Sequence, residues 1–252
     1  MQSLVRATPN ALRSFLIIGV AALALPAEAE ACGCGGTHSS LVALRGADIV
    51  FVGKVAKIDR PKPQSHVNAD GSVSVAFAGG PIVTTFEISQ SFLGSDSEQV
   101  VIVGNGADCD EPFEQDEVWL VYGRVVDGRV VTSKCTRTRP RVDAQSDLAY
   151  LSGLAQKKPQ GIVYGEVLRR ITTADGRPAL QSPFEVLTVV AVRDDRRTET
   201  TAEKWGPYQL VLPPGDYQIW VERAGRPVGS RQSVHVADGT DQRLGLIVGD
   251  KN

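Results

Sequence analysis

Residues 48–58 read DIVFVGKVAKI, and this stretch decides the fold class. Large apolar side chains alternate along it with small or charged ones, which is the period of two expected for a β-strand. Valine, isoleucine and phenylalanine, which supply its bulk, are residues that strands favour. The stretch therefore predicts the first strand of a β domain.

Four further strand-like stretches follow, separated by Gly, Asn and Asp turn residues. They are PIVTTFEISQSFLG at 81–94, QVVIVGNG at 99–106, EVWLVYGRVV at 117–126 and RVVTSKCT at 129–136. Between the first and second strands, the polar stretch RPKPQSHVNADGS at 60–72 predicts a long exposed loop.

After these five strands the period changes to that of a helix. Leu148, Leu151 and Leu154 fall on one helical face, and Asp143 can cap the helix. The Lys, Pro and Gly residues of QKKPQG, which follows, suit a linker, which we place at 155–160.

Beyond the linker, residues 161–252 return to short strands joined by turn signals such as Asp175-Gly176 and Pro214-Gly215. Regular spacing without helices predicts an antiparallel β-sandwich. The chain is therefore expected to be all-β, with a first domain over 32–154 and the sandwich over 161–252.

The N-terminus has the features of a secretory signal, which we place at residues 1–31. Arg6 and Arg13 precede the apolar run FLIIGVAALAL at 15–25. A run of roughly 11 residues is too short to span a bilayer, which needs about 20, but it suits a signal peptide. No later stretch is long and apolar enough to cross a membrane, so we expect a soluble protein secreted to the periplasm or the extracellular space.

The cleavage site of this signal has alternatives. Cleavage after Ala29 releases a chain that starts at Glu30, and cleavage after Ala31 releases one that starts at Cys32. A lipid anchor on Cys32 is the third alternative. It is disfavoured, because lipoprotein signals usually carry a larger aliphatic residue at the position of Ala29 and avoid the charge of Glu30.

Charge and cysteine content narrow the function classes. The formal net charge is −2, and it is unchanged without residues 1–31, so there is no basic surplus to bind nucleic acid. All four cysteines, which are Cys32, Cys34, Cys109 and Cys135, follow the signal. In an exported chain they predict two disulfides.

A zinc site is the rival interpretation of the cysteines. Cys32, Cys34, His38 and Cys109 supply suitable ligand types, but structural zinc favours two to four residues between paired ligands, and Cys32 and Cys34 are one residue apart. We therefore expect no intrinsic metal and no cofactor. The three histidines are scattered and no phosphate loop is present, so no catalytic set is visible and we expect no enzyme.

Two long-range disulfides would tie the N-terminus to the first domain. Closing loops of about 75–100 residues contributes up to about 4 kcal/mol each by the chain-entropy view. Two neighbouring cysteines bonded to different strands would also hold a chain end that otherwise frays. The pattern predicts a rigid, exposed terminus.

Here the residues resemble a known family. The Cys-x-Cys start, ADIVFVGKV at 47–55, the strand ending in FLG, and the cysteines in GNGADC and VTSKC are similar to the N-terminal domain of tissue inhibitors of metalloproteinases. That domain is a netrin-like module with a five-stranded OB-type barrel, and the resemblance covers residues 32–154. It implies the pairings Cys32–Cys109 and Cys34–Cys135; the family's third bridge in this domain has no counterpart here.

The resemblance also implies a mechanism. In the family, the N-terminal cysteine chelates the catalytic zinc of a protease through its α-amine and its carbonyl oxygen. Carried over, Cys32 is the chelator, and Gly33, Cys34, Ala107 and Asp108 form the contact ridge. Family members usually have Thr or Ser where this chain has Gly33. The implied partner is an extracellular zinc metallopeptidase, which the protein binds and can inhibit.

The second half has its own resemblance. GIVYGEV, GRPAL, YQLVLPPGDYQIWVE and LGLIV are similar to carboxypeptidase-regulatory or transthyretin-like sandwiches, with Tyr208 and Tyr217 matching the two tyrosines around the Pro-Pro-Gly turn. Such modules are widespread in exported bacterial proteins and bring no catalytic residues. The alternative function is accordingly a non-inhibitory exported or cell-surface binding or adhesion protein, in which both domains are interaction modules.

Overall fold

The computed structural model describes residue 34 and residues 38–77, 80–104, 109–183, 185–202 and 206–249. Residues Ala31–Asn252 belong to one compact unit. The expected signal peptide lies outside the described residues, and so do Cys32, Gly33, Ala107 and Asp108. In the described part, no helix has the length and apolar character needed to span a bilayer.

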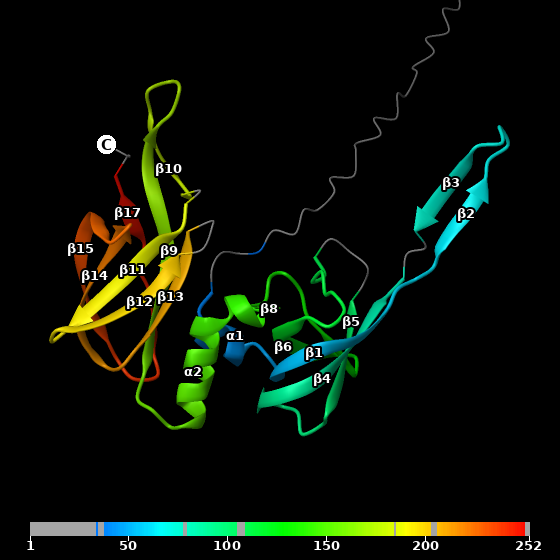
Figure 1. Cartoon of the computed structure of the whole chain (residues 1–252), viewed down its shortest axis with the longest axis horizontal. Helices are drawn as coiled ribbons and strands as arrows, with labels where there is room; N and C mark the ends of the chain where they lie inside the picture. Colours follow the sequence, from blue (N-terminus) through cyan, green and yellow to red (C-terminus); the bar gives the residue numbers. More distant parts are fainter. Residues whose placement is uncertain are drawn as a thin grey trace, which may run out of the picture. The chain divides into compact units, whose positions relative to one another are not determined.

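The first half forms a closed five-stranded barrel, as expected (Figure 1). β1 pairs antiparallel with both β4 and β6, β4 pairs with β5, and β7 closes the ring between β5, to which it is parallel, and β6. This is the order of an OB-type barrel. The barrel strands are β1 (Ile49–Asp59), β4 (Ile82–Leu93), β5 (Gln99–Gly104), β6 (Val118–Val126) and β7 (Arg129–Val131). The short strand β8 (Arg139–Pro140) pairs antiparallel with β6.

β1 is buried on both of its faces. Phe51 packs inside the barrel, where edge-to-face contacts link it through Phe86 and Phe113 to Trp119. Val50 and Val52 point to the other side and join a second cluster beneath helix α2 (Gln145–Ala155). This double burial explains the unbroken apolar run IVFV within an otherwise alternating strand.

Curvature of β1 depends on three register shifts along its pairing with β4, one of which lies between Val52 and Gly53. A Cβ at Gly53 would lie 3.0 Å from the Glu87 carbonyl oxygen. Glycine therefore permits the close approach that lets the strand bend around the barrel.

The prediction of a long loop over 60–72 is wrong. Residues in this stretch form β2 (Pro63–Val67), which pairs with β3 (Val73–Phe77), and Figure 1 shows this hairpin extending away from the barrel strands. The turn is closed by the Asn68 amide, which donates to the Ser72 carbonyl at 2.8 Å. The β2 sequence PQSHV has no apolar period, so periodicity gave no signal of a strand there.

Helix α2 lies where it was expected, but its start differs. Asp143 ends a 3₁₀ turn, η1 (Arg141–Asp143), and the N-cap is Ala144 with no capping side chain. Leu151 is buried, whereas Leu154 is largely exposed. A short helix, α1 (Ser40–Arg45), was not predicted; Ser39 caps it by accepting a hydrogen bond from the Val42 amide.

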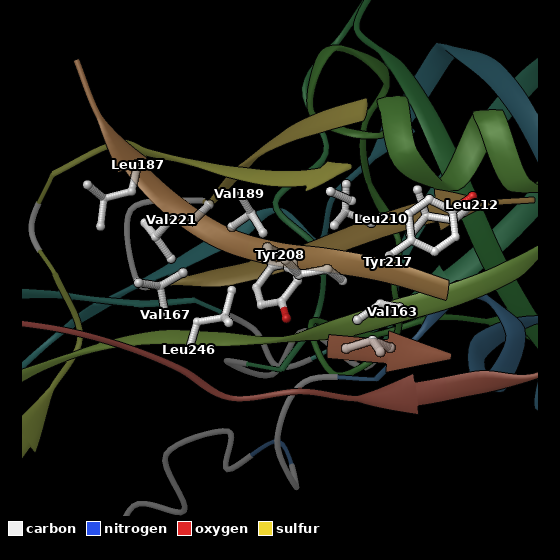
Figure 2. Packing of buried hydrophobic residues seen from close by; sticks show 14 of the residues in the cluster. Val163, Val167, Leu187, Val189, Tyr208, Leu210, Leu212, Tyr217, Val221 and Leu246 are labelled. Atoms are coloured by element: carbon white, nitrogen blue, oxygen red, sulfur yellow. The ribbon is translucent and has the colours of Figure 1, made fainter. Parts of the chain in front are cut away.

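The second half consists of two sheets that share one core (Figure 2). Val163 and Val167 come from one sheet, and Val189 and Val221 come from the other. The first sheet contains β9 (Gly161–Thr172), β10 (Pro178–Gln181), β13 (Pro207–Leu212), β16 (Asp241–Arg243) and β17 (Leu246–Val248). The second contains β11 (Leu187–Arg193), β12 (Arg196–Ala202), β14 (Gly215–Arg223) and β15 (Arg226–Val236).

These sheets are not wholly antiparallel, which corrects the expectation. β16 and β17 both run parallel to β9. The returning chain passes so close to β9 that a Cβ at Gly165 would lie 2.2 Å from the Leu244 carbonyl oxygen. Glycine at this position permits the parallel approach. The polar edge strand β12 and the short β10 were also not predicted.

Both helices pack against strands of the second half. Leu41 of α1, Tyr150 of α2 and Ile162 of β9 form a small buried cluster. The described residues on either side of the expected linker thus contact one another, and the boundary at 155–160 stays a prediction.

Candidate functional site

The disulfide expected between Cys34 and Cys135 is confirmed. It joins residues 101 positions apart, with a Cα–Cα distance of 4.9 Å, and both cysteines are exposed. Cys135 lies in an ordered turn after β7, in which the Thr136 amide donates to the Ser133 carbonyl at 2.9 Å. The bridge therefore attaches Cys34 to a part of the barrel with its own internal hydrogen bonds.

Cys109 lies beside this turn and is also disulfide-bonded. Its carbonyl oxygen accepts a hydrogen bond of 2.9 Å from the amide of Lys134, the residue before Cys135. Its expected partner Cys32 lies outside the described residues, so the Cys32–Cys109 pairing stays a prediction. The same holds for the contact ridge of Gly33, Cys34, Ala107 and Asp108, of which only Cys34 is described.

A buried arginine holds the chain four residues after Cys34. The Nη1 of Arg137 donates to the His38 carbonyl oxygen at 2.6 Å. Its Nε and Nη2 donate to the two carboxylate oxygens of Asp147, each at 2.6 Å. These two hydrogen bonds make the ion pair bidentate. Arg137 is 8% exposed and Asp147 is fully buried, so the pair is shielded from water.

Asp147 has a third donor, which is the Tyr122 hydroxyl at 3.0 Å. Burial, reinforced by the charge of Asp147, raises the pKa of Tyr122 well above its usual value, so the phenol stays protonated and donates. Strand β6, helix α2 and the segment after Cys135 therefore converge on one carboxylate. Because Arg137 extends from this cluster to His38, the cluster fixes the course of the chain before α1.

Threonine hydroxyls attach the Cys135 turn to β6. Thr132 donates to the Tyr122 carbonyl at 2.9 Å, and Thr138 accepts from the Tyr122 amide at 2.9 Å. The Thr136 hydroxyl bonds to both threonines. The turn that carries Cys135 is thus held on both sides of the disulfide.

The sequence offered few signals for these residues. Arg137 follows Cys135 by two positions, and Asp147 stands among the apolar residues of a predicted helix. The only local signals were the charge of Arg137 close to a cysteine and the acid Asp147 next to the leucine-bearing face of the helix. Neither signal indicates that these two residues pair with each other.

The acidic stretch 109–117 is partly buried. Phe113 enters the barrel core. Burial raises the pKa of Glu111 to about 7, against the opposing charges of Lys134 and Arg139. Across the residues with assigned positions, no group of three or more His, Cys, Asp or Glu side chains is arranged to hold a metal ion.

Comparison with known proteins gives little further information. No family profile matches the chain, and no curated protein matches it. Among solved structures, it is similar to the Bacillus anthracis TIE protein, with 13% identity and a TM-score of 0.28 over 81% of this chain and 35% of that one. It is also similar to a fimbrial protein from Bacteroides ovatus, with 9% identity and a TM-score of 0.22 over 81% of this chain and 45% of that one.

The chain therefore spans less than half the length of either solved protein. At these identities and TM-scores, neither likeness bears on function. The site is defined by the chain's own residues: an N-terminal segment, here Cys34 and residues 38–45, that is fixed covalently at Cys34 and by a buried arginine at His38.

Proposed function

We propose that the exported protein binds and inhibits a zinc metallopeptidase through the α-amine and carbonyl oxygen of Cys32. The observation that carries this proposal is the double attachment of the segment directly after Cys32. Cys34 is bonded to Cys135, and the His38 carbonyl is bonded to Arg137. Two residues span at most about 7 Å, so a chain end at Cys32 stays within that distance of the fixed Cys34.

The chemistry of a free chain end suits the open position of a catalytic zinc. An α-amine has a pKa near 8, so zinc can displace its proton at neutral pH. The amine and the carbonyl of the same residue form a five-membered chelate. That chelate would replace the water that a zinc peptidase activates for hydrolysis. The sulfur of Cys32 is not a ligand in this arrangement; its disulfide orients the backbone.

The proposal includes a domain assignment and a location. Residues 32–154 form a netrin-like barrel domain, and residues 161–252 form a sandwich of the carboxypeptidase-regulatory or transthyretin-like type. Tyr208 and Tyr217 support the latter, since both are buried and donate to the carbonyls of Leu244 and Pro213. The Cys34–Cys135 disulfide is consistent with an oxidising, extracytoplasmic compartment.

The test has two parts. Mass spectrometry of the secreted chain should show a first residue Cys32 with a free amine and an unacylated sulfur. The mature chain should then inhibit at least one member of a panel of zinc metallopeptidases, and one added alanine before Cys32 should abolish inhibition, because it converts the amine into an amide. One alanine added after Asn252 is the matched control.

Retained Glu30 and Ala31, or inhibition that survives the added alanine, would contradict the proposal. A mature chain that binds a partner equally well with and without the added alanine would instead favour a non-inhibitory binding or adhesion protein.

A further inference from the structure

The second half of the chain contacts the N-terminal segment directly, through side chains that are far away in sequence. We infer that Gln209 and Asp241 are positioning residues, which set the course of the N-terminal segment together with Arg137. Their effect on inhibition rests on the proposed function, whereas their effect on the segment itself does not.

Gln209 holds Ser40 by two reciprocal hydrogen bonds. The Ser40 amide donates to Gln209 Oε1 at 2.8 Å, and Gln209 Nε2 donates to Ser40 Oγ at 2.9 Å. Ser40 is fully buried and Gln209 is 3% exposed, so water does not replace these bonds. Both ends of the glutamine amide are thus directed at one residue, 169 positions earlier.

Asp241 orients the cap of helix α1. A serine hydroxyl has a single hydrogen to donate. In Ser39 that hydrogen goes to Asp241 Oδ2 at 2.5 Å, which leaves the oxygen lone pairs facing the Val42 amide at 3.1 Å. Asp241 therefore selects the hydroxyl orientation that caps the helix.

The two sets of contacts hold adjacent points of one short segment. Cys135 and Arg137, on the barrel side, hold Cys34 and His38. Gln209 and Asp241 hold Ser40 and Ser39. Because the second set follows immediately after the first, loosening it leaves the segment held only at Cys34 and His38, with less restraint on its orientation.

The experiment uses the full mature chain with Gln209→Met, which keeps the side-chain length and removes both hydrogen bonds. The matched control is Gln160→Met. Gln160 is also buried, but it donates to the Tyr150 carbonyl in α2 and not to the N-terminal segment. The measurements are amide hydrogen exchange, inhibition of the metallopeptidase and thermal unfolding.

In Gln209→Met we expect exchange of the 40–45 amides to be at least about tenfold faster, because the loss of one of the two buried hydrogen bonds already accounts for this factor. Inhibition should weaken by a similar factor. In Gln160→Met, exchange should accelerate in α2 and not at 40–45, and inhibition should stay unchanged. Unchanged exchange at 40–45 in Gln209→Met, or equal acceleration there in both variants, would overturn the inference.

A second pair of variants keeps the test decisive if Gln209→Met does not fold. Asp241→Leu should accelerate exchange of the Val42 amide, and Asp241→Asn, which retains an acceptor for Ser39, should restore it. Failure of Asp241→Leu to change that amide would count against the inference. Faster exchange in a protein that inhibits no peptidase even in its native form would leave the inference standing and reject the proposed function.

Discussion

Replacement of Asp147 by Asn tests whether the Arg137 cluster carries a desolvated charge. The substitution preserves the shape of the side chain but removes the negative charge that receives two hydrogen bonds of 2.6 Å from Arg137. The guanidinium, 8% exposed, then loses the carboxylate charge that two of its 2.6 Å hydrogen bonds reach. Breaking a buried pair on one side in this way costs about 3–5 kcal/mol of unfolding free energy.

For a chain of this size, such a loss corresponds to a decrease of roughly 6–20 °C in the melting temperature. Urea and thermal unfolding of the disulfide-intact protein measure both quantities. The double variant Arg137→Met/Asp147→Leu removes both charges and should lose less than Asp147→Asn, by at least about 1 kcal/mol.

The matched control is the exposed pair of Lys57 and Asp59, which is 2.7 Å apart. Asp59→Ala should change the unfolding free energy by less than about 1 kcal/mol. If Asp147→Asn destabilises the protein no more than this control does, the charge of Arg137 is hydrated and the cluster is not a rigid anchor for His38.

Three further predictions concern stability. The pKa of Glu111 in the folded state is raised to about 7 from 4.5, so between these pH values the folded state binds one more proton than the unfolded state, and the unfolding free energy should fall as pH rises from about 4.5 to 7. Glu111→Gln should reduce this pH dependence in urea unfolding at several pH values, and an unaltered pH dependence would refute the assignment. The unfolding free energy of the double variant Cys34→Ala/Cys135→Ala should be lower by up to about 4 kcal/mol, since the disulfide closes a loop with a sequence separation of 101. A decrease near zero in urea unfolding would show that the disulfide does not restrain the unfolded chain. Gly165→Ala should lower the unfolding free energy by about 1–3 kcal/mol or more, because the added Cβ would clash with the Leu244 carbonyl oxygen. Gly245→Ala, with open space around its Cβ, should be tolerated, and equal melting temperatures for the two variants would contradict this account.

The two kinds of attachment to the N-terminal segment differ in what they resist. The Cys34–Cys135 disulfide sets a maximum distance but leaves rotation about its bonds. The hydrogen bonds of the His38 carbonyl and the Ser40 amide fix the orientation of two peptide units, and Asp241 holds the Ser39 hydroxyl between them. Because a two-atom chelate requires both position and orientation, the proposed function needs both kinds of contact.

Local sequence was sufficient where a strand or a helix has a periodic apolar face, whereas the cysteine pairing came from the family resemblance. The strand at 48–58, the barrel strands after it, the helix over 145–155 and the Cys34–Cys135 pair, implied by the family resemblance, are all present. A period of two or of 3.6 is a property of neighbouring residues, so it can be read without knowing what each face packs against.

Other features depended on partners that no local pattern names. The strand β2 is only five residues long, α1 is only six residues long, and the parallel return of β16 and β17 depends on glycines whose role is visible only when two strands meet. The environment of Trp220 also depended on such partners: it is buried outside the core clusters, lies against the Arg231 guanidinium and donates to Glu222.

The sequence by itself thus determined an all-β chain, and the family resemblance added the barrel and the Cys34–Cys135 pairing. Only the tertiary structure decided that Arg137 pairs with Asp147, and that Gln209 reaches Ser40. Hydrogen bonds are short-range and directional, so a buried polar side chain acquires its role when the fold brings its partner within about 3 Å. Periodicity records which side of a strand is buried, but it carries no information about which distant residue will lie there.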